Sequence, residues 1–252
     1  MSLKRHIPNA ITCGNILCGC MAVLCAFQGN LLWAALFMLV GAGFDFFDGM
    51  MARLLGVFSP MGRELDSLAD VITFGLAPSV MLYTALRYLM AAAVRGGELG
   101  DGQLWLAIAL PYVGFGVVVF SALRLAKYNV DERQAMNFIG LPTPANALFW
   151  GALLTSGFSV GVSPLATAAT YVLLIGVMCW LLISELPMMA FKFKHWGWKG
   201  NELRYALAAV VLVLVASFGA AGWGMAGISV AVLAYVLFSA IAWSVGSHTN
   251  AN

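Results

Sequence analysis

The sequence predicts an all-α integral membrane protein, a bundle of about eight transmembrane helices. Of its 252 residues, 62% are hydrophobic and only 10% are charged, whereas globular proteins have roughly 25% charged residues. The mean hydropathy is +0.91. The apolar runs are long and continuous, which favours helices over the short alternating strands of a membrane barrel. Because each span takes about 20 residues, residues 1–252 are expected to form a single membrane domain.

Eight apolar runs, each bounded by glycine, proline or charged residues, are the expected spans. The fifth is short for a helix that crosses a bilayer, which needs about 20 residues. In chain order, the expected spans are approximately Ile11 to Gln28, Leu31 to Leu55, Asp66 to Ala93, Gln103 to Lys127, Thr143 to Phe158, Leu165 to Ser184, Arg204 to Ala220 and Met225 to Val245.

The basic residues predict the orientation of the bundle. Eleven of the thirteen Lys and Arg residues fall on the side of the two termini, and the opposite side keeps Arg87 and Arg95. Cytoplasmic loops collect Lys and Arg, so both termini are expected in the cytoplasm and the chain in the cell's inner membrane. The segment from Phe191 to Lys199 interleaves aromatic and basic residues. This pattern is typical of an interfacial segment that contacts anionic lipid head groups, and we expect no binding of nucleic acid.

The acidic residues are concentrated in one short segment at the end of the second run. A carboxylate within the hydrocarbon core costs about 2.5 kcal/mol or more unless it meets water, a metal ion or a cation. Asp45 and Asp48 are spaced i and i+3, and Asp66 and Asp70 are spaced i and i+4, so each pair occupies one face of its helix. Five of the eleven acidic residues lie within 26 positions, namely Asp45, Asp48, Glu64, Asp66 and Asp70.

The residues between the two pairs allow the chain to reverse its direction. Gly56, Ser59, Pro60 and Gly62 lie there, so the two helices can run antiparallel with their acidic faces opposed. Four carboxylates would then converge near the cytoplasmic surface, where their mutual repulsion would be severe. Divalent cations relieve that repulsion. Ligation by oxygen alone suits Mg²⁺, Mn²⁺ or Ca²⁺ rather than zinc, because no His or Cys accompanies the aspartates.

Small residues and an arginine accompany the acidic faces. Gly49, Ala52 and Gly62 leave room for a flat or bulky group against the backbone, although close helix packing is an alternative reason for the first two. Arg53 adjoins them, and a guanidinium group can hold two phosphate oxygens at once. Metal ions, an arginine and a groove of small residues together predict a site for a pyrophosphate or a nucleotide.

This pattern resembles the signature of the CDP-alcohol phosphotransferases, membrane enzymes that move a phosphatidyl or related group from a CDP-linked donor to an alcohol. Softer similarities, to the branch that uses L-serine, occur at 8–19, 67–78, 124–129 and 140–144. The resemblance covers roughly residues 1–190, and the helices of 200–252 are additions to that core. The matching pattern is Asp45-x2-Asp48-Gly49-x2-Ala52-Arg53-x8-Gly62-x3-Asp66-x3-Asp70.

The resemblance implies roles for these residues. Asp45 and Asp66 would bridge two metal ions, Mg²⁺ or Mn²⁺, while Asp48 binds one of them. Asp70 would bind the other ion and act as the catalytic base. The family also implies a homodimer. The residues implied to contact CDP-diacylglycerol are Gly49, Ala52, Arg53 and Ser59, with Asn9 and Thr12 toward the cytidine.

The expected reaction transfers the phosphatidyl group to L-serine in phospholipid synthesis, giving phosphatidylserine and CMP. Asp70 would activate the serine hydroxyl for a single displacement at phosphorus. Arg124, Lys127 and Asn129 stand at the cytoplasmic end of the fourth run and are candidates for holding serine. Anchoring of a helix end at the membrane surface is the alternative role of these basic residues.

Other functions fit the sequence less well. Within the family, the acceptor could be glycerol 3-phosphate or inositol phosphate, whose negative charge calls for more basic residues near the site. An aspartate-rich prenyltransferase would carry its acidic motifs on distant helices, whereas only 17 residues separate Asp48 from Asp66. A cation transporter would need acidic residues deep in other spans. The other expected spans contain none at depth, and Glu185 lies near the end of one.

Overall fold

The computed structural model describes residues 6–57, 59–131, 138–156, 163–188, 202–222 and 225–249, most of them helical. The expected interfacial segment from Phe191 to Lys199 lies outside these residues. The described elements are α1 (His6–Phe27), α2 (Leu31–Leu55), α3 (Pro60–Asp70), η2 (Val71–Leu76), α4 (Ala77–Arg95), η3 (Asp101–Gln103), α5 (Leu104–Ala109), η4 (Leu110–Phe115), α6 (Gly116–Val130), β1 (Phe138–Ile139), α7 (Thr143–Thr155), α8 (Pro164–Ile183), β2 (Pro187–Met188), α9 (Glu202–Ala220) and α10 (Ala226–Thr249).

The helices confirm the predicted all-α membrane class. A helix lies at each of the eight predicted runs, but α7, at the fifth run, has only 13 residues. The apolar stretches Leu207–Ala220 and Ala226–Ile241 are also shorter than a typical span, so the number eight stays a prediction. Within the described part of the chain, five helical segments are long and apolar enough to cross a membrane, namely His6–Phe27, Leu31–Leu55, Pro60–Arg95, Asp101–Val130 and Pro164–Ile183.

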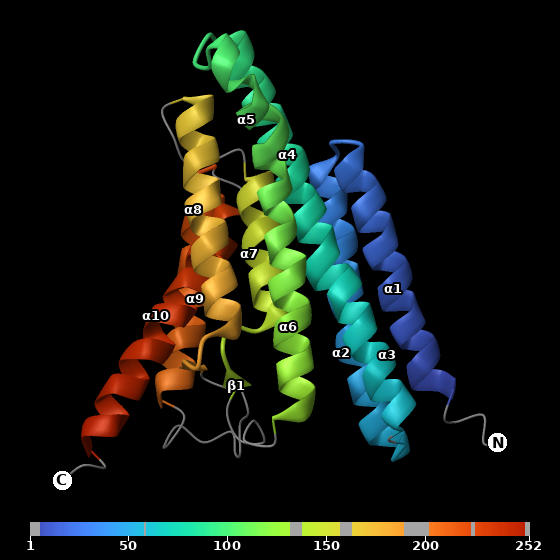
Figure 1. Cartoon of the computed structure of the whole chain (residues 1–252). Coiled ribbons are helices and arrows are strands. Elements are labelled where there is room, and N and C mark those ends of the chain that lie inside the picture. Colours follow the sequence, from blue (N-terminus) through green and yellow to red (C-terminus); the bar gives the residue numbers. More distant parts are fainter. Residues whose placement is uncertain are drawn as a thin grey trace.

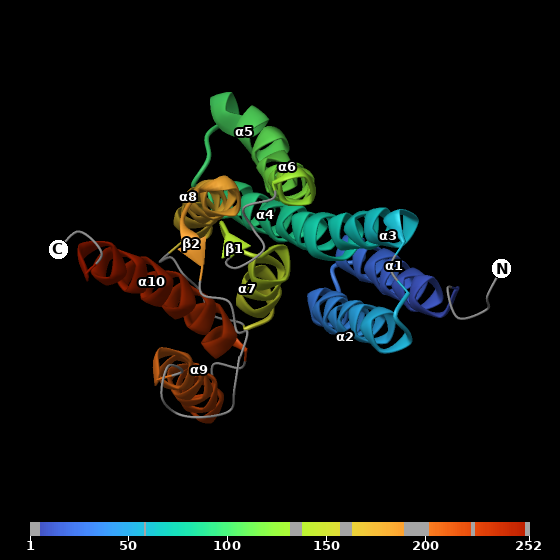
Figure 2. The same ribbon diagram turned by 90° about the horizontal axis from the view of Figure 1, so that it is seen from below.

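Helix α4 lies at the centre of the bundle and packs against α1, α6, α7 and α8 (Figure 1). Seen from below, the α1–α2 hairpin lies at one end of the molecule and the α9–α10 pair beyond α7 at the other (Figure 2). One hydrophobic core, with Trp150 and Leu86, joins α4 to α6, α7, α8 and α10. A second core, with Phe74 and Met81, joins α4 to α1 and α2. The central helix is therefore shared by both cores.

The third predicted span begins earlier than expected. It is helical from Pro60 rather than Asp66, and it runs to Arg95 through α3, η2 and α4. Its middle part, Val71–Leu76, is a π-helical turn directly after Asp70. The Thr73 hydroxyl donates a hydrogen bond of 3.1 Å to the Asn15 carbonyl of α1, which fixes this turn against the hairpin. One continuous element therefore carries both an acidic pair and the central packing helix.

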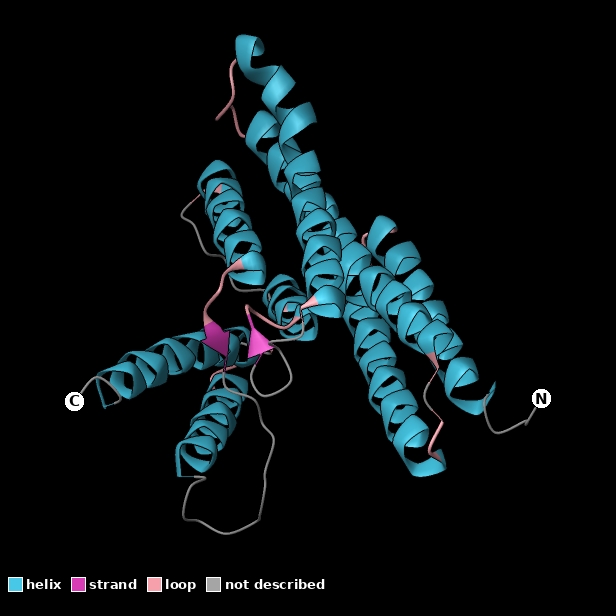
Figure 3. Ribbon diagram, turned by 60° about the horizontal axis from the view of Figure 1, so that its bottom comes forward, coloured by secondary structure: helices cyan, strands magenta, loops and turns pink. Residues whose placement is uncertain are grey.

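A two-residue antiparallel ladder of β1 and β2 was not predicted from the sequence (Figure 3). It joins the residues before α7 to the residues after α8. The Gly140 amide donates to the Leu186 carbonyl at 2.9 Å, and the Leu141 amide donates to the Leu181 carbonyl at 2.9 Å. These bonds fix the entry into α7, and with it the start of that helix at Thr143.

Gly140→Ala is expected to lower the thermal stability of the protein strongly. Gly140 has φ +76°, which L side chains rarely adopt, and a Cβ there would lie 2.7 Å from the Leu182 carbonyl oxygen. Such backbone strain costs about 1–3 kcal/mol before the clash is counted. Melting in detergent, followed by size-exclusion chromatography, measures the effect. Gly176→Ala is the matched control, because no atom lies within 4 Å of its Cβ position. Equal melting temperatures for the two variants would contradict the prediction.

Candidate functional site

The turn between α2 and α3 reverses the chain, so that the acidic pair of each helix faces the other pair. Helix α2 ends at Leu55, followed by Gly56 at φ 63°, a left-handed conformation that favours glycine. The Ser59 hydroxyl then caps α3 by accepting a hydrogen bond of 3.0 Å from the Gly62 amide, and Pro60 occupies the first helical position. The predicted reversal is confirmed, with Gly62 inside the first turn of α3 rather than in the loop.

The acidic cluster consists of Asp45 and Asp48 from α2 with Asp66 and Asp70 from α3. One carboxylate oxygen from each of Asp45, Asp48 and Asp66 lies within 4.8 Å of the other two. Asp45 also adjoins the Asp70 carboxyl group. Asp66 and Asp70 each have a buried Oδ1 atom without a hydrogen-bond partner. A set of close, unpartnered oxygen atoms fits a hard divalent cation such as Mg²⁺, Mn²⁺ or Ca²⁺.

Thr12 of α1 supports the acidic cluster. Its hydroxyl lies 2.6 Å from Asp48 Oδ2 and 3.0 Å from the Pro8 carbonyl oxygen. The shorter contact is typical of a hydroxyl that donates to a charged carboxylate. Thr12 was expected to approach the cytidine, and it does line the pocket described next. Its hydrogen bond to Asp48 gives it a second task, which is to orient a carboxylate of the cluster.

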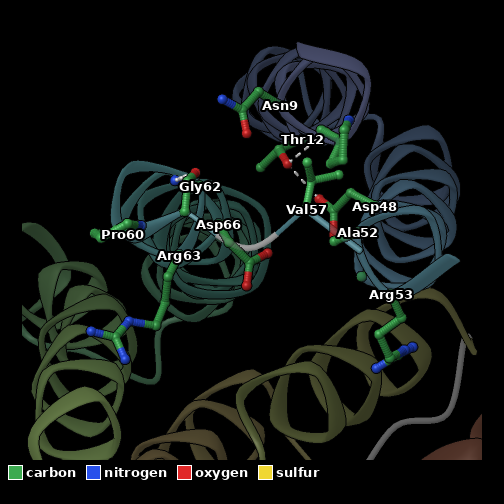
Figure 4. A pocket seen from close by; sticks show the side chains of 13 residues that line it. Asn9, Thr12, Asp48, Ala52, Arg53, Val57, Pro60, Gly62, Arg63 and Asp66 are labelled. Carbon is green, nitrogen blue, oxygen red and sulfur yellow. Dashed lines mark hydrogen bonds between the residues drawn. The ribbon is translucent and has the colours of Figure 1, made fainter. Parts of the chain in front are cut away.

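A pocket of about 580 Å³ opens beside the cluster between α1, α2 and α3 (Figure 4). It contains all six residues expected to contact CDP-diacylglycerol, together with Asp48 and Asp66. Asp45 and Asp70 do not line it. The two arginine side chains extend from opposite helices on either side of Asp66. The pocket is lined by Pro8, Asn9, Thr12, Asp48, Gly49, Ala52, Arg53, Val57, Ser59, Pro60, Gly62, Arg63 and Asp66.

Arg63 is the most important pocket residue that the sequence reasoning did not assign to the site. It lies one helical turn before Asp66, so the two side chains share a face of α3. That spacing was a usable signal for a second cation beside the predicted phosphate site. Arg53 and Arg63 together frame the pocket with two guanidinium groups.

The two glycines of the pocket have different structural roles. A Cβ at Gly62 would lie 3.0 Å from Ser59 Oγ and 3.2 Å from Asn9 Oδ1, so this glycine permits a close approach of α1 and α3. A Cβ at Gly49 would meet only the Arg53 guanidinium, at 3.9 Å. Close helix packing, the alternative reason for a small residue at this position, therefore does not explain Gly49. Its missing side chain leaves open space in the pocket.

Gly49→Leu is expected to raise the KM for the nucleotide-linked lipid by about tenfold or more. A tenfold change corresponds to a loss of about 1.4 kcal/mol of binding free energy. The new side chain would start from a Cβ position whose nearest neighbour is Arg53 Nη2 at 3.9 Å and would extend into pocket space. Gly43→Leu, the same change on α2 at a glycine with no atom within 4 Å of its Cβ position and outside the pocket, serves as the control. Steady-state kinetics with varied lipid substrate measures both. An unchanged KM in Gly49→Leu would contradict the prediction.

The three residues expected to hold serine separate in the structure. Arg124 is buried, at 7% exposure, and its Nη1 donates to Thr143 Oγ1 at 2.7 Å. It also interacts electrostatically with Asp70. Lys127 instead pairs with Glu185 at 3.5 Å on the surface. The Asn129 amide donates to Ser67 Oγ at 2.9 Å, which ties α6 to α3. Of the three, Arg124 is the one with an electrostatic interaction with a carboxylate of the acidic cluster.

The fold and the site define the protein as an all-α membrane protein that holds a carboxylate cluster suited to divalent cations beside an arginine-framed pocket. A family model described as CDP-alcohol phosphatidyltransferase matches residues 5–248. The chain therefore belongs to this family, as the aspartate pattern predicted.

Two of the chain's relatives carry the same activity in their names, and a third is named for a related serine lipid. A protein of Bacillus subtilis named CDP-diacylglycerol–serine O-phosphatidyltransferase is 36% identical over 76% of this chain and 93% of its own length. A protein of the same name from Helicobacter pylori is 29% identical over 76% of this chain and 75% of its own length. An archaetidylserine synthase of Methanothermobacter thermautotrophicus is 31% identical over 60% of this chain and 59% of its own length.

Proposed function

We propose that the protein transfers the phosphatidyl group of CDP-diacylglycerol to L-serine, giving phosphatidylserine and CMP in phospholipid synthesis. The observation that carries this function is the carboxylate cluster of α2 and α3 beside a pocket with two arginines. The names of relatives up to 36% identical support serine as the acceptor.

Divalent-metal dependence is general in the family. Asp45, Asp48, Asp66 and Asp70 would hold two ions, Mg²⁺ or Mn²⁺. When bound, such ions neutralise pyrophosphate charge and stabilise the leaving CMP. The Thr12 hydroxyl orients the Asp48 carboxylate through its bond of 2.6 Å and keeps it ready for ligation.

The pocket receives the nucleotide end of CDP-diacylglycerol. Arg53 and Arg63 both line the pocket, and we expect their guanidinium groups to hold phosphate oxygens in bidentate fashion. Asn9 offers an amide to the cytidine, while Gly49 and Ala52 leave room for it. Ser59 shapes the same wall, since its hydroxyl oxygen is already engaged by the Gly62 amide. The acyl chains stay in the bilayer around the exposed apolar faces of α1 and α2.

The proposed reaction is a single displacement at phosphorus. Asp70 takes the proton of the serine hydroxyl as that oxygen bonds to the lipid phosphorus. The bond from this phosphorus to the bridging oxygen breaks, and CMP leaves with the electron pair. Arg124, which interacts with Asp70, is the residue that we expect to hold the serine carboxylate. Lys127 and Asn129 support this end of α6 through Glu185 and Ser67.

The proposed placement in the cell follows the charge bias. The acidic cluster lies at the ends of α2 and α3 where the predicted cytoplasmic side has Arg53 and Arg63. We place the active site and both termini in the cytoplasm, with eight helices in the inner membrane as one domain. Residues 1–190 form the family core, 200–252 add the last two helices, and two copies associate as a homodimer.

An acceptor panel tests this function. Purified protein with CDP-diacylglycerol and Mg²⁺ or Mn²⁺ receives labelled L-serine, glycerol 3-phosphate or inositol phosphate, and lipid products are separated. Incorporation of serine with stoichiometric release of CMP is the expected result. Incorporation of glycerol 3-phosphate or inositol phosphate instead would show that the protein has another activity of the same family. Absence of CMP release with every acceptor would reject a transferase of this family.

A further inference from the structure

Helices α6 and α7 each carry buried polar atoms without a hydrogen-bond partner, outside the pocket and the acidic cluster. Ser121 Oγ and Arg124 Nε of α6, and both amide atoms of Asn146 on α7, are buried without a hydrogen-bond partner. Ser121 and Asn146 are each 0% exposed. A buried polar group left unsatisfied costs about 1–3 kcal/mol. Asn146 carries two such atoms, so a polar group that binds there would recover substantial free energy.

Helical spacing and one hydrogen bond relate these residues. Thr143 and Asn146 are one turn apart on α7 and share a face, as Ser121 and Arg124 do on α6. The bond of 2.7 Å from Arg124 to Thr143 joins the two faces. The π-helical turn η2 packs against both helices, and it follows Asp70 directly. Since Arg124 also interacts with Asp70, this polar group of residues extends from the proposed base into the protein.

The chemistry of the free atoms matches an amino acid. Arg124 Nε is a free donor, which suits a carboxylate, and Asn146 Oδ1 is a free acceptor, which suits an ammonium group. We propose that Asn146 determines acceptor specificity by accepting a hydrogen bond from the ammonium group of the amino acid. This inference rests on the proposed function and deepens it. An acceptor without an ammonium group, such as glycerol 3-phosphate, leaves Asn146 Oδ1 unpaired and is disfavoured.

Asn146→Leu tests the assignment, because it keeps the branching of the side chain at Cγ and removes both polar atoms. The KM for L-serine is expected to rise by about tenfold or more, while the KM for CDP-diacylglycerol stays within about twofold of the wild-type value. The melting temperature should hold or rise, because an unpaired buried amide becomes apolar. Thr84→Val is the matched control. Thr84 Oγ1 is also buried and unpartnered, but it lies on α4, so its removal should leave the serine KM unchanged.

A substrate analogue separates binding from general disturbance. 3-Hydroxypropionate keeps the hydroxyl and carboxylate of serine but lacks the ammonium group. As a competitor of serine, it should have the same inhibition constant in wild type and Asn146→Leu. Asn146→Ala, which removes the same atoms without bulk, replaces the leucine variant if the latter does not fold.

Three results would overturn the inference. These are a serine KM within about twofold of wild type, a parallel rise in the KM for CDP-diacylglycerol, and equal weakening of serine and 3-hydroxypropionate. Wild-type turnover with serine, measured in the same assay, keeps this outcome distinct from a failure of the proposed function.

Discussion

Asp70→Asn is expected to reduce kcat for phosphatidyl transfer to serine by about 10²- to 10⁴-fold, the contribution typical of a positioned general base. The amide has the shape of the carboxylate but cannot take the proton of the acceptor hydroxyl. Asp70 is the suited candidate because it is the member of the acidic cluster that lies outside the close group of Asp45, Asp48 and Asp66. It is also the carboxylate of the cluster with which Arg124, on the proposed acceptor side, interacts electrostatically.

The measurement is CMP release with saturating serine, alongside the melting temperature. Glu64→Gln provides the matched control, since Glu64 is an exposed acidic residue of the same helix and its neutralisation should leave kcat within about twofold. A variant Asp70→Asn that keeps more than about a tenth of the wild-type kcat would exclude Asp70 as the base.

Removal of divalent cations is expected to abolish turnover and to lower the melting temperature. Without cations the acidic cluster holds four carboxylates in close proximity, and their repulsion opposes the close approach of the acidic faces of α2 and α3. Return of Mg²⁺ or Mn²⁺ at a hundred times its dissociation constant should stabilise the fold by about 2.7 kcal/mol. The test compares EDTA-treated protein with and without added Mg²⁺, Mn²⁺ or Ca²⁺ in thermal melts and in the serine assay.

Ionic strength needs its own control, because salt alone screens like charges. Matched NaCl should restore neither activity nor the full melting temperature. Asp66→Asn should remove most of the melting response to Mg²⁺, because its Oδ1 is one of the unpartnered oxygens of the cluster. Full turnover in EDTA would overturn the metal assignment.

The sequence predicted the parts of this fold that depend on local patterns. Long apolar runs gave the helices, and the i, i+3 and i, i+4 spacing gave the two acidic faces that meet in the structure. Gly56 and Ser59 gave the reversal between them, because helix caps follow short-range rules. The pocket residues expected from the family pattern also lie together.

Features that depend on tertiary contacts were not predictable in this way. The onset of α3 at Pro60 rather than Asp66 reflects the Ser59 cap in a polar stretch that hydropathy does not mark. The different surroundings of Arg124 and Lys127, three residues apart, come from which neighbours α6 meets. Asn146 carried no pattern at all, because an unpartnered amide is visible only when its surroundings are known.

The π-helical turn Val71–Leu76 sets the rotational phase of the third element. A π turn contains an additional residue compared with an α turn, and each residue of an α-helix turns the chain by about 100°. The turn therefore lets Asp66 and Asp70 face α2 while the side chains of α4 face the central cores. Loss of a single residue from this turn would keep the helix unbroken. It would rotate the acidic face of α3 relative to the core face of α4, so that the two could no longer meet α2 and the hydrophobic cores at the same time. The length of the segment, as well as its sequence, is a condition for having a stable bundle and an assembled site in one molecule.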